Sequence, residues 1–333
     1  MFLSQVRILV HHPSHPRLLA DVGGTNARFG WQTEAGGEIA HIRVLPCADH
    51  VGLVEAIEAY LKQTGLPMPA CAALGMAVTV TGDAVAMTNH HWKFSVGDVR
   101  ERLGLQRLLV LNDFTALALA LPHLPASSRW SVGPVSQAPA SGPIGLIGPG
   151  TGLGVSGLMP VPGNGRWVPI VGEGGHVSLS ASTAEEFAVI MQIQRRYGHA
   201  SAERAVSGPG LVDLYHALSQ VRGSPSIEIT SPAQVLELAL QEGRSLAGDA
   251  LDLFCGFLGS VAGDLALTLG ARGGIYIGGG IVPRMKARFA QSPFRARFEA
   301  KGRFAAYLRE IPTWVIDAPV SPALMGASLA LDI

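Results

Sequence analysis

The fold of this 333-residue chain is decided by the stretch Leu18-Leu19-Ala20-Asp21-Val22-Gly23-Gly24-Thr25-Asn26-Ala27-Arg28-Phe29-Gly30. Apolar residues run into an acid, two glycines and three polar residues, and then the stretch becomes apolar again. This pattern predicts a strand, a tight turn and a returning strand. The paired glycines allow positive φ and a close approach of backbone N–H groups, which can form an anion-binding concavity. An ordinary glycine hairpin explains this stretch equally well.

Asp21 needs a partner if the turn binds phosphate, because two anions repel. A divalent cation such as Mg²⁺, placed between the carboxylate and the phosphate, removes that repulsion. We therefore expect Asp21 to act through Mg²⁺.

The composition is that of a globular protein large enough for two cores, with 48% hydrophobic and 15% charged residues. A formal net charge of zero argues against a nucleic-acid or membrane-surface partner. Cys47, Cys71 and Cys255 are scattered, which is typical of a reducing compartment. The longest apolar stretch, 251–269, is interrupted by two aspartates and predicts a buried helix rather than a membrane span. These features together predict a cytoplasmic protein.

The order of the predicted elements favours an α/β protein, because strand-rich segments are each followed by helices. Residues 18–30 and 144–157 form an approximate repeat of strand, glycine turn with threonine, and strand. Residues 122–142 are rich in Pro, Ser and Ala, a composition typical of a connection between domains. Residues 1–17 are predicted to be a loose extension.

The second glycine turn is Gly148-x-Gly150-Thr151-Gly152-x-Gly154. It is not a Rossmann fingerprint, since the third glycine of that motif would fall on Leu153, and the chain contains no P-loop. Two such turns in two halves of the chain favour a pair of turns that hold the phosphates of one nucleotide.

Asn112 and Asp113 lie between a predicted strand and a predicted helix. Both residue types are favoured as helix caps. A carboxylate at the carboxyl end of a strand can also accept a proton from a substrate hydroxyl whose oxygen attacks phosphorus. Both interpretations remain open on spacing alone.

Two further glycine-rich segments are candidates for ligand contact. Gly172-Glu173-Gly174-Gly175-His176 places a carboxylate and an imidazole three residues apart, which suits hydrogen bonds to neighbouring hydroxyls and lacks a third ligand for zinc. Gly278-Gly279-Gly280-Ile281 is either a plain turn between a strand and a helix or a bare surface for a flat base. Glu203 by itself resembles an exposed helix charge.

A series of motifs makes a family resemblance specific. They are Asp21-Val-Gly-Gly-Thr-Asn-Ala-Arg-Phe29, Thr88-Asn-His-His-Trp92, Leu111-Asn-Asp-Phe114, Gly148-Pro-Gly-Thr-Gly-Leu-Gly154, Gly172-Glu-Gly-Gly-His-Val177, Ser201-Ala-Glu-Arg204, Ser207-Gly-Pro-Gly-Leu211 and Gly278-Gly-Gly-Ile-Val-Pro-Arg284. In order and spacing they resemble bacterial glucokinases from residue 18 to the C-terminus.

The resemblance implies a two-domain actin-like (ribonuclease H-like) ATPase fold of the hexokinase type, with an active-site cleft between the domains. The expected division is an extension of residues 1–17, a small α/β domain of residues 18–122 plus 318–333, and a large α/β domain of residues 123–317. The family is usually homodimeric and uses Mg·ATP.

By position, the resemblance also assigns roles to individual residues. The implied catalytic base is Asp113, and the implied glucose ligands are Asn112, Asp113, Glu173, His176 and Glu203. The implied ATP-binding residues are Ala20, Asp21, Val22, Gly23, Gly24 and Thr25 in the first turn, Gly148, Gly150, Thr151 and Gly152 in the second, and Gly278, Gly279, Gly280 and Ile281 for adenosine. Asp21 is the implied Mg²⁺ residue.

The expected activity is phosphorylation of the 6-hydroxyl of glucose by ATP, the entry step of glycolysis. The alternative is a sugar-responsive regulator on the same scaffold. A DNA-binding regulator would need a basic helix-turn-helix segment, which neither the charge balance nor residues 1–17 provide. The sequence leaves open how strictly glucose is preferred and whether ADP or polyphosphate replaces ATP.

Overall fold

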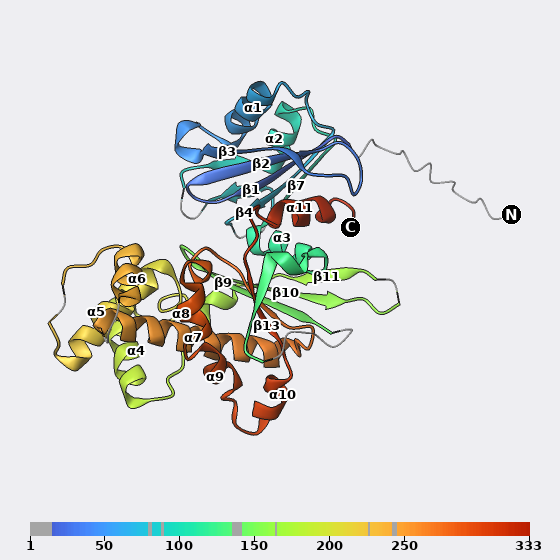
Figure 1. The fold of residues 1–333 in the computed structure, drawn as a ribbon. Coiled ribbons are helices and arrows are strands. Elements are labelled where there is room, and N and C mark those ends of the chain that lie inside the picture. Colours follow the sequence, from blue (N-terminus) through green and yellow to red (C-terminus); the bar gives the residue numbers. More distant parts are fainter. Residues whose placement is uncertain are drawn as a thin grey trace. The chain divides into compact units, whose positions relative to one another are not determined.

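The computed structural model describes residues 15–78, 82–87, 90–134, 142–163, 165–225, 227–241 and 245–333. Its contacts divide the chain into two compact units, which are labelled by element in Figure 1. Unit 1 comprises the described residues up to Pro122 together with Ser321–Ile333, and unit 2 comprises His123–Val320. The mixed α/β architecture predicted from the sequence is confirmed. Residues 1–14, Thr88 and Asn89 lie outside the described residues.

The sheet of unit 1 has five strands in the order β3-β2-β1-β4-β7. The first three strands are sequential antiparallel neighbours, and β1 and β2 form the strand, turn and strand predicted over residues 18–30. The other two strands run parallel to β1. The strands are β1 (Arg17–Val22), β2 (Asn26–Gln32), β3 (Ala40–Pro46), β4 (Cys71–Met76) and β7 (Arg107–Asn112). The unit also contains a short hairpin, β5 (Ala84–Ala86) and β6 (Lys93–Ser95).

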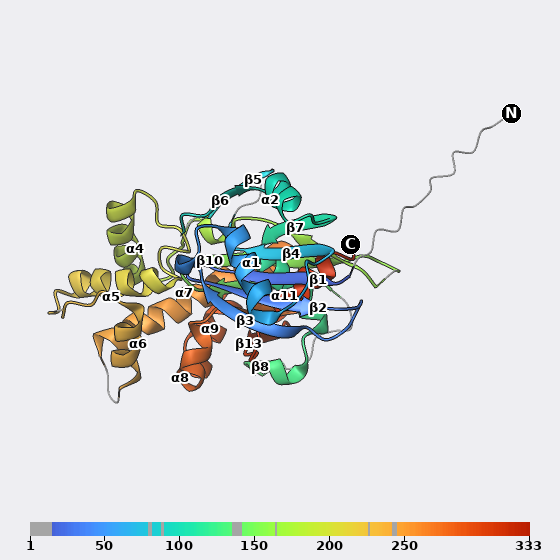
Figure 2. The ribbon, with the colours of Figure 1, turned by 90° about the horizontal axis from the view of Figure 1, so that it is seen from above.

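Helices cover both faces of this sheet, because successive side chains of a strand point to opposite faces. Leu18 and Ala20 contribute to a core with α1 (Leu53–Thr64) and α2 (Val96–Arg102), and Figure 2 shows α1 lying over the strands. Leu19 instead packs with α11 (Ala323–Ala330) on the other face. Both faces of β1 are therefore buried.

The helix α3 (Asp113–Ala120) packs against both β4 and α11, and α11 also packs on β1 and β4. Its Ala116 lies against Gly75 of β4, where an added Cβ would be 3.0 Å from the alanine Cβ. On its other side Ala116 lies against Gly326 of α11, where an added Cβ would overlap the alanine carbonyl oxygen. Two glycines thus allow a close approach that fixes the position of α3.

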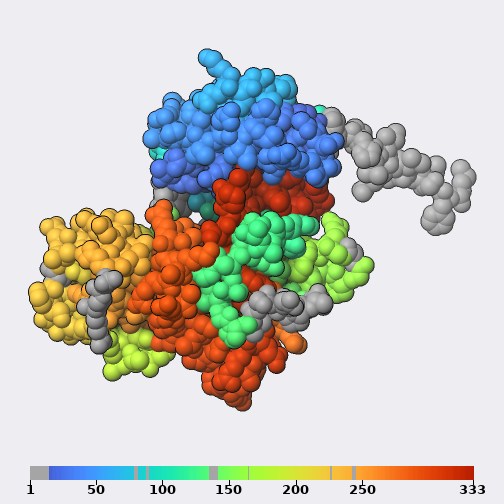
Figure 3. All heavy atoms as spheres, in the orientation of Figure 1, coloured from blue at the N-terminus to red at the C-terminus, as the bar shows by residue number. Residues whose placement is uncertain are grey.

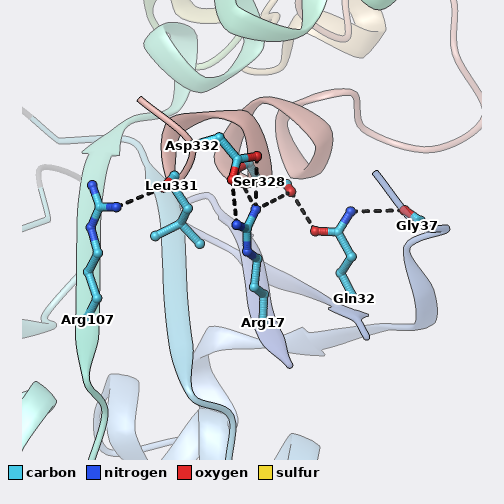
Figure 4. A network of polar contacts seen from close by, with 7 residues as sticks. All are labelled: Arg17, Gln32, Gly37, Arg107, Ser328, Leu331 and Asp332. Atoms are coloured by element: carbon cyan, nitrogen blue, oxygen red, sulfur yellow. Dashed lines mark hydrogen bonds and ion pairs between the residues drawn. The ribbon is translucent and has the colours of Figure 1, made fainter. Parts of the chain in front are cut away.

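The C-terminal helix is tied to the first strands by buried polar contacts, which Figure 4 shows in close-up. Arg17 is 2% exposed and donates to Asp332 at 2.5 Å and to the carbonyl oxygen of Ser328 at 3.2 Å. The Ser328 hydroxyl donates to Gln32 at 2.6 Å. Figure 3 shows the red C-terminal atoms against the blue N-terminal ones. Because Arg17 is a buried strand residue, the predicted loose extension of residues 1–17 is wrong at its end.

The sheet of unit 2 has six strands in the order β11-β10-β9-β12-β13-β8. Its strands are β8 (Arg129–Val132), β9 (Ile144–Pro149), β10 (Leu153–Pro160), β11 (Trp167–Ile170), β12 (Ile275–Ile277) and β13 (Thr313–Ile316). The antiparallel pair β9–β10 repeats the arrangement of β1–β2, which confirms the predicted repeat. Residues 122–142 are not only a connection, because β8 within them pairs with β13; residues 135–141 are not described.

The helices of unit 2 share one large hydrophobic core. They are α4 (Ala184–Tyr197), α5 (Gly208–Arg222), α6 (Pro232–Leu240), α7 (Leu246–Leu269), α8 (Lys286–Ala290), α9 (Phe294–Glu299) and α10 (Ala305–Arg309). The first four begin at a Ser or Thr whose side chain accepts a backbone N–H, a strong start signal. By length and hydropathy α7 could span a membrane, yet 72% of its most apolar window is buried, as in a core helix.

Candidate active site

The first glycine turn joins β1 to β2 and is closed by a hydrogen bond from Gly23 N to Asn26 O of 2.9 Å. Arg28 lies opposite Asp21 in the hairpin and donates to its carboxylate at 3.1 Å. The Thr25 side chain is exposed. The positive φ expected from the glycine pair is not found at Gly23, where an added Cβ would make only an ordinary contact. The turn itself forms as predicted.

Cys47 supports this turn through its backbone N–H and its thiol, and no motif in the sequence pointed to this role. Its backbone N–H donates to Thr25 O at 2.8 Å, and its thiol lies 3.4 Å from Gly23 O as a donor. The side chain is buried, and this burial raises the pKa of the thiol. The group therefore stays protonated at neutral pH and keeps its donor hydrogen.

Asn112 ends β7 and caps α3. Its Oδ1 accepts from Phe114 N at 2.9 Å and from Thr115 N at 3.2 Å, while its Nδ2 donates to Val78 O at 3.2 Å. The interpretation of Asn112 as a helix cap is thus confirmed, and among the described residues its second amide N–H has no hydrogen-bond acceptor.

Asp113 is the first residue of α3, where a negative charge is favoured by the helix dipole. One of its carboxylate oxygens accepts from Phe114 N at 2.9 Å, and the side chain is partly exposed. Gly75 on the neighbouring strand lies between Asp113 and the first turn: an added Cβ there would be 3.6 Å from Asp113 Cα and 3.7 Å from Ala20 O. Val22 pairs with Met76 of β4, and Met76 pairs with Asn112, so Asp113 and the first turn follow strands that end at the same edge of the sheet, with β4 between them.

The second glycine turn joins β9 to β10 and is closed by Gly150 N donating to Gly152 O at 2.8 Å. Gly208, at the start of α5, donates from its N to Gly150 O at 2.8 Å. Gly279 packs onto Pro149 with φ 80°, and an added Cβ would overlap the proline carbonyl oxygen. A glycine is therefore required at position 279. The segment 278–281 lies against the second turn in unit 2, and the predicted helix after it begins as a 3-10 turn, Val282–Met285.

Glu173 precedes a 3-10 turn, Gly174–His176, which ends at His176, and both side chains are exposed. His176 N donates to Glu173 O at 3.0 Å. Gly175 between them is buried against Leu153, where an added Cβ would overlap the leucine carbonyl oxygen. The two side chains are thus held beside the second turn, as ligands of a small polar molecule would be.

Glu203 is not the exposed helix charge that its surroundings in the sequence suggest. It lies in a turn before α5 and is only partly exposed. Its N donates to Gly175 O at 2.9 Å, and its Oε2 accepts from Leu153 N at 2.9 Å. Glu203 therefore contacts both the second glycine turn and the segment that carries Glu173 and His176.

The predicted site residues fall into one cluster in each unit. Unit 1 gathers the first turn with Asn112 and Asp113, and unit 2 gathers the second turn with Glu173, His176, Glu203 and Gly278–Ile281. Within the described parts of the chain, no group of three or more His, Cys, Asp or Glu side chains could hold a metal ion. Asp21 offers one carboxylate that is already engaged by Arg28, which suits a Mg²⁺ ion held mostly by phosphate oxygens.

Comparison with known proteins identifies a family. A family model described as glucokinase matches residues 18–333. A glucokinase from Aromatoleum aromaticum is 52% identical over 96% of this chain and 95% of its own length. A bifunctional protein from Paraburkholderia xenovorans is 48% identical over 96% of this chain, which spans about half (49%) of that relative.

Solved structures share the fold. The crystal structure of a glucokinase from an Antarctic psychrotroph has a TM-score of 0.84 and 35% identity, and the match covers 95% of this chain and 98% of that one. A ROK family glucokinase from Streptomyces griseus, in complex with glucose and AMPPNP, has a TM-score of 0.61 and 19% identity over 95% and 99% of the two chains. The second likeness shows a common sugar-kinase fold.

Proposed function

The chain belongs to the glucokinase family, and from that premise we propose that it transfers the γ-phosphoryl group of ATP to the 6-hydroxyl of D-glucose. The products are glucose 6-phosphate and ADP. Residues of both units take part. The observation that carries the proposal is that Asp113 and the first glycine turn lie at the same edge of the unit 1 sheet, with β4 between their strands.

Asp113 acts as the general base. Its carboxylate accepts the proton of the 6-hydroxyl as that oxygen forms a bond to the γ-phosphorus, and the bond from phosphorus to the ADP oxygen breaks. Asn112 caps the helix that carries Asp113 and offers its remaining amide N–H to the sugar. The resemblance to bacterial glucokinases, matched by position, supports this role for Asp113.

The two glycine turns hold the phosphates with backbone N–H groups and with the exposed hydroxyls of Thr25 and Thr151. Asp21 would hold Mg²⁺, which when bound with ATP neutralises charge on the phosphates. Gly279 and Gly280 would present bare backbone to adenosine, since an added Cβ at Gly280 meets nothing within 4 Å.

Glu173, His176 and Glu203 orient the sugar through its hydroxyl groups. Such pairing favours glucose over analogues that lack a paired hydroxyl, because buried polar groups would then be left unmatched. The family resemblance also supports a homodimer and a cytoplasmic location.

The test compares Asp113→Asn with Asp98→Asn. Asp98 is an exposed aspartate in the first turn of α2, so it matches the loss of a helix N-terminal charge. Asp113→Asn should lower kcat by about 10²-fold or more while glucose KM stays near the wild-type value. The control should keep full activity. A coupled assay over several hexoses with ATP, ADP or polyphosphate fixes acceptor and donor, and near-normal kcat in a folded Asp113→Asn protein would refute the assignment.

A further inference from the structure

The Glu203 side chain is placed differently from an ordinary sugar ligand. Its Oε2 accepts the backbone N–H of Leu153, the first residue after the second glycine turn, at 2.9 Å. Among the contacts of the described residues, its other oxygen, Oε1, has no hydrogen-bond donor. One carboxylate oxygen therefore accepts a hydrogen bond from the end of the turn, and the other can accept one from a ligand.

The surroundings of Glu203 are shaped for this contact. A Cβ on Gly152 would overlap Oε2, so a larger residue at position 152 would make the Glu203 carboxylate shift away from its present place beside Leu153. The Glu203 backbone N–H donates to Gly175 O at 2.9 Å, which fixes the residue to the segment carrying Glu173 and His176. The carboxylate thus lies at the junction of two predicted binding segments within unit 2.

We infer that Glu203 is a positioning residue for the nucleotide as well as a sugar ligand. The Leu153 N–H donates a hydrogen bond to the carboxylate. This bond holds the end of the second glycine turn, which binds phosphate in the proposed function. A hydrogen bond to an ionised group is among the stronger ones in a protein. Binding of a sugar hydroxyl at Oε1 and binding of phosphate at the turn are therefore coupled through one side chain. The inference rests on the proposed function for the identity of the two ligands.

Two substitutions of Glu203 separate these roles. In Glu203→Gln the amide oxygen still accepts from Leu153 N, but the sugar meets a donor instead of an acceptor. In Glu203→Ala both interactions are lost. We expect both variants to weaken glucose binding, whereas the affinity for Mg·AMPPNP measured without sugar falls by about 10-fold only in Glu203→Ala.

Amide exchange followed by NMR tests the contact without any ligand. Exchange of the Leu153 N–H should accelerate in Glu203→Ala and remain slow in Glu203→Gln. Gly278, whose N donates to Ile147 O at 2.8 Å, is the internal reference for the folding of unit 2. A second pair of variants tests the same contact from the turn. Gly152→Ala should accelerate exchange of the Leu153 N–H, because the added Cβ would overlap the Glu203 carboxylate. Gly150→Ala should leave this exchange slow, because an added Cβ at Gly150 meets nothing within 4 Å.

The outcomes are decisive. Equal Mg·AMPPNP affinity in wild type and Glu203→Ala, measured by calorimetry, would overturn the positioning role, as would unchanged Leu153 exchange. A fall in affinity in Glu203→Gln as large as in Glu203→Ala would show that charge, not the bond to Leu153, matters. A wild-type protein that binds Mg·AMPPNP with this pattern but does not phosphorylate glucose would refute the proposed function and leave the coupling of Glu203 to the nucleotide standing.

Discussion

Replacing Gly326 with alanine tests how tightly α11 packs against the helix that carries Asp113. An added Cβ would lie 2.6 Å from the carbonyl carbon of Ala116 and closer still to its oxygen, whereas ordinary contact begins at 3.4 Å. To clear the carbonyl oxygen, the two helices would have to separate by about 1.5–2 Å, which a densely packed interior resists. Neither helix is free to move, because Gly75 confines α3 and Arg17 ties α11 to β1.

The expected loss in the free energy of unfolding follows from two opposing effects. Overpacking costs about 1–3 kcal/mol, and alanine in place of glycine within a helix contributes about 0.5–1 kcal/mol in the opposite direction. Gly326→Ala should therefore lower the free energy of unfolding of unit 1 by about 1–2 kcal/mol. The matched control is Gly256→Ala in α7, where an added Cβ would lie 3.7 Å from its nearest neighbour and should be neutral or stabilising.

Urea denaturation gives the midpoints of both variants. A chain with two units can unfold in more than one step, so amide exchange of buried β1 residues such as Leu19 reports unit 1 separately. If α3 is displaced, Asp113 moves with it, and a 1 Å error at a reacting group can cost about 10²-fold in kcat. A Gly326→Ala protein as stable as Gly256→Ala would refute the inferred packing.

Two further predictions concern the buried Arg17 guanidinium, whose partner Asp332 is 48% exposed, and the buried Cys255 thiol. Asp332→Asn should lower the free energy of unfolding by about 1–2 kcal/mol, because Arg17 is 2% exposed and loses its charged partner. The control, Glu55→Gln, removes the charge of an exposed pair with Arg102 and should change the free energy of unfolding by less than about 1 kcal/mol. Equal urea midpoints for the two variants would contradict this. Burial raises the pKa of the Cys255 thiol from 9.0 to about 12, so the stability that its proton provides is complete below pH 9 and is lost as the pH rises towards 12. Urea midpoints from pH 8 to 11 should therefore fall more steeply for wild type than for Cys255→Ser, and parallel curves would refute this.

Much of the fold could be predicted from local patterns. The hairpin over 18–30 forms because alternation and paired glycines act within a few residues, and α4 to α7 begin at hydroxyl caps that the sequence displays. The strand β8 and the helix α9 were not predicted. A strand as short as Arg129–Val132 gains its stability from pairing with β13, about 180 residues later, and no local signal announces that partner.

The candidate site, too, contains residues that could be predicted from the sequence and residues that could not. Glycines and carboxylates stand out in a sequence because chemistry restricts which residues can replace them, so Asp113, Glu173 and His176 could be proposed from the chain alone. The residues that hold Glu203 and the first turn in place could not be predicted in this way. They act through backbone groups, which every residue has, or through side chains that follow no special pattern. Leu153 contributes a backbone N–H, and Cys47 contributes a buried thiol. The contact between Glu203 and Leu153 joins positions 50 residues apart, and only the fold of unit 2 brings the carboxylate that we propose binds sugar onto the turn that we propose binds phosphate.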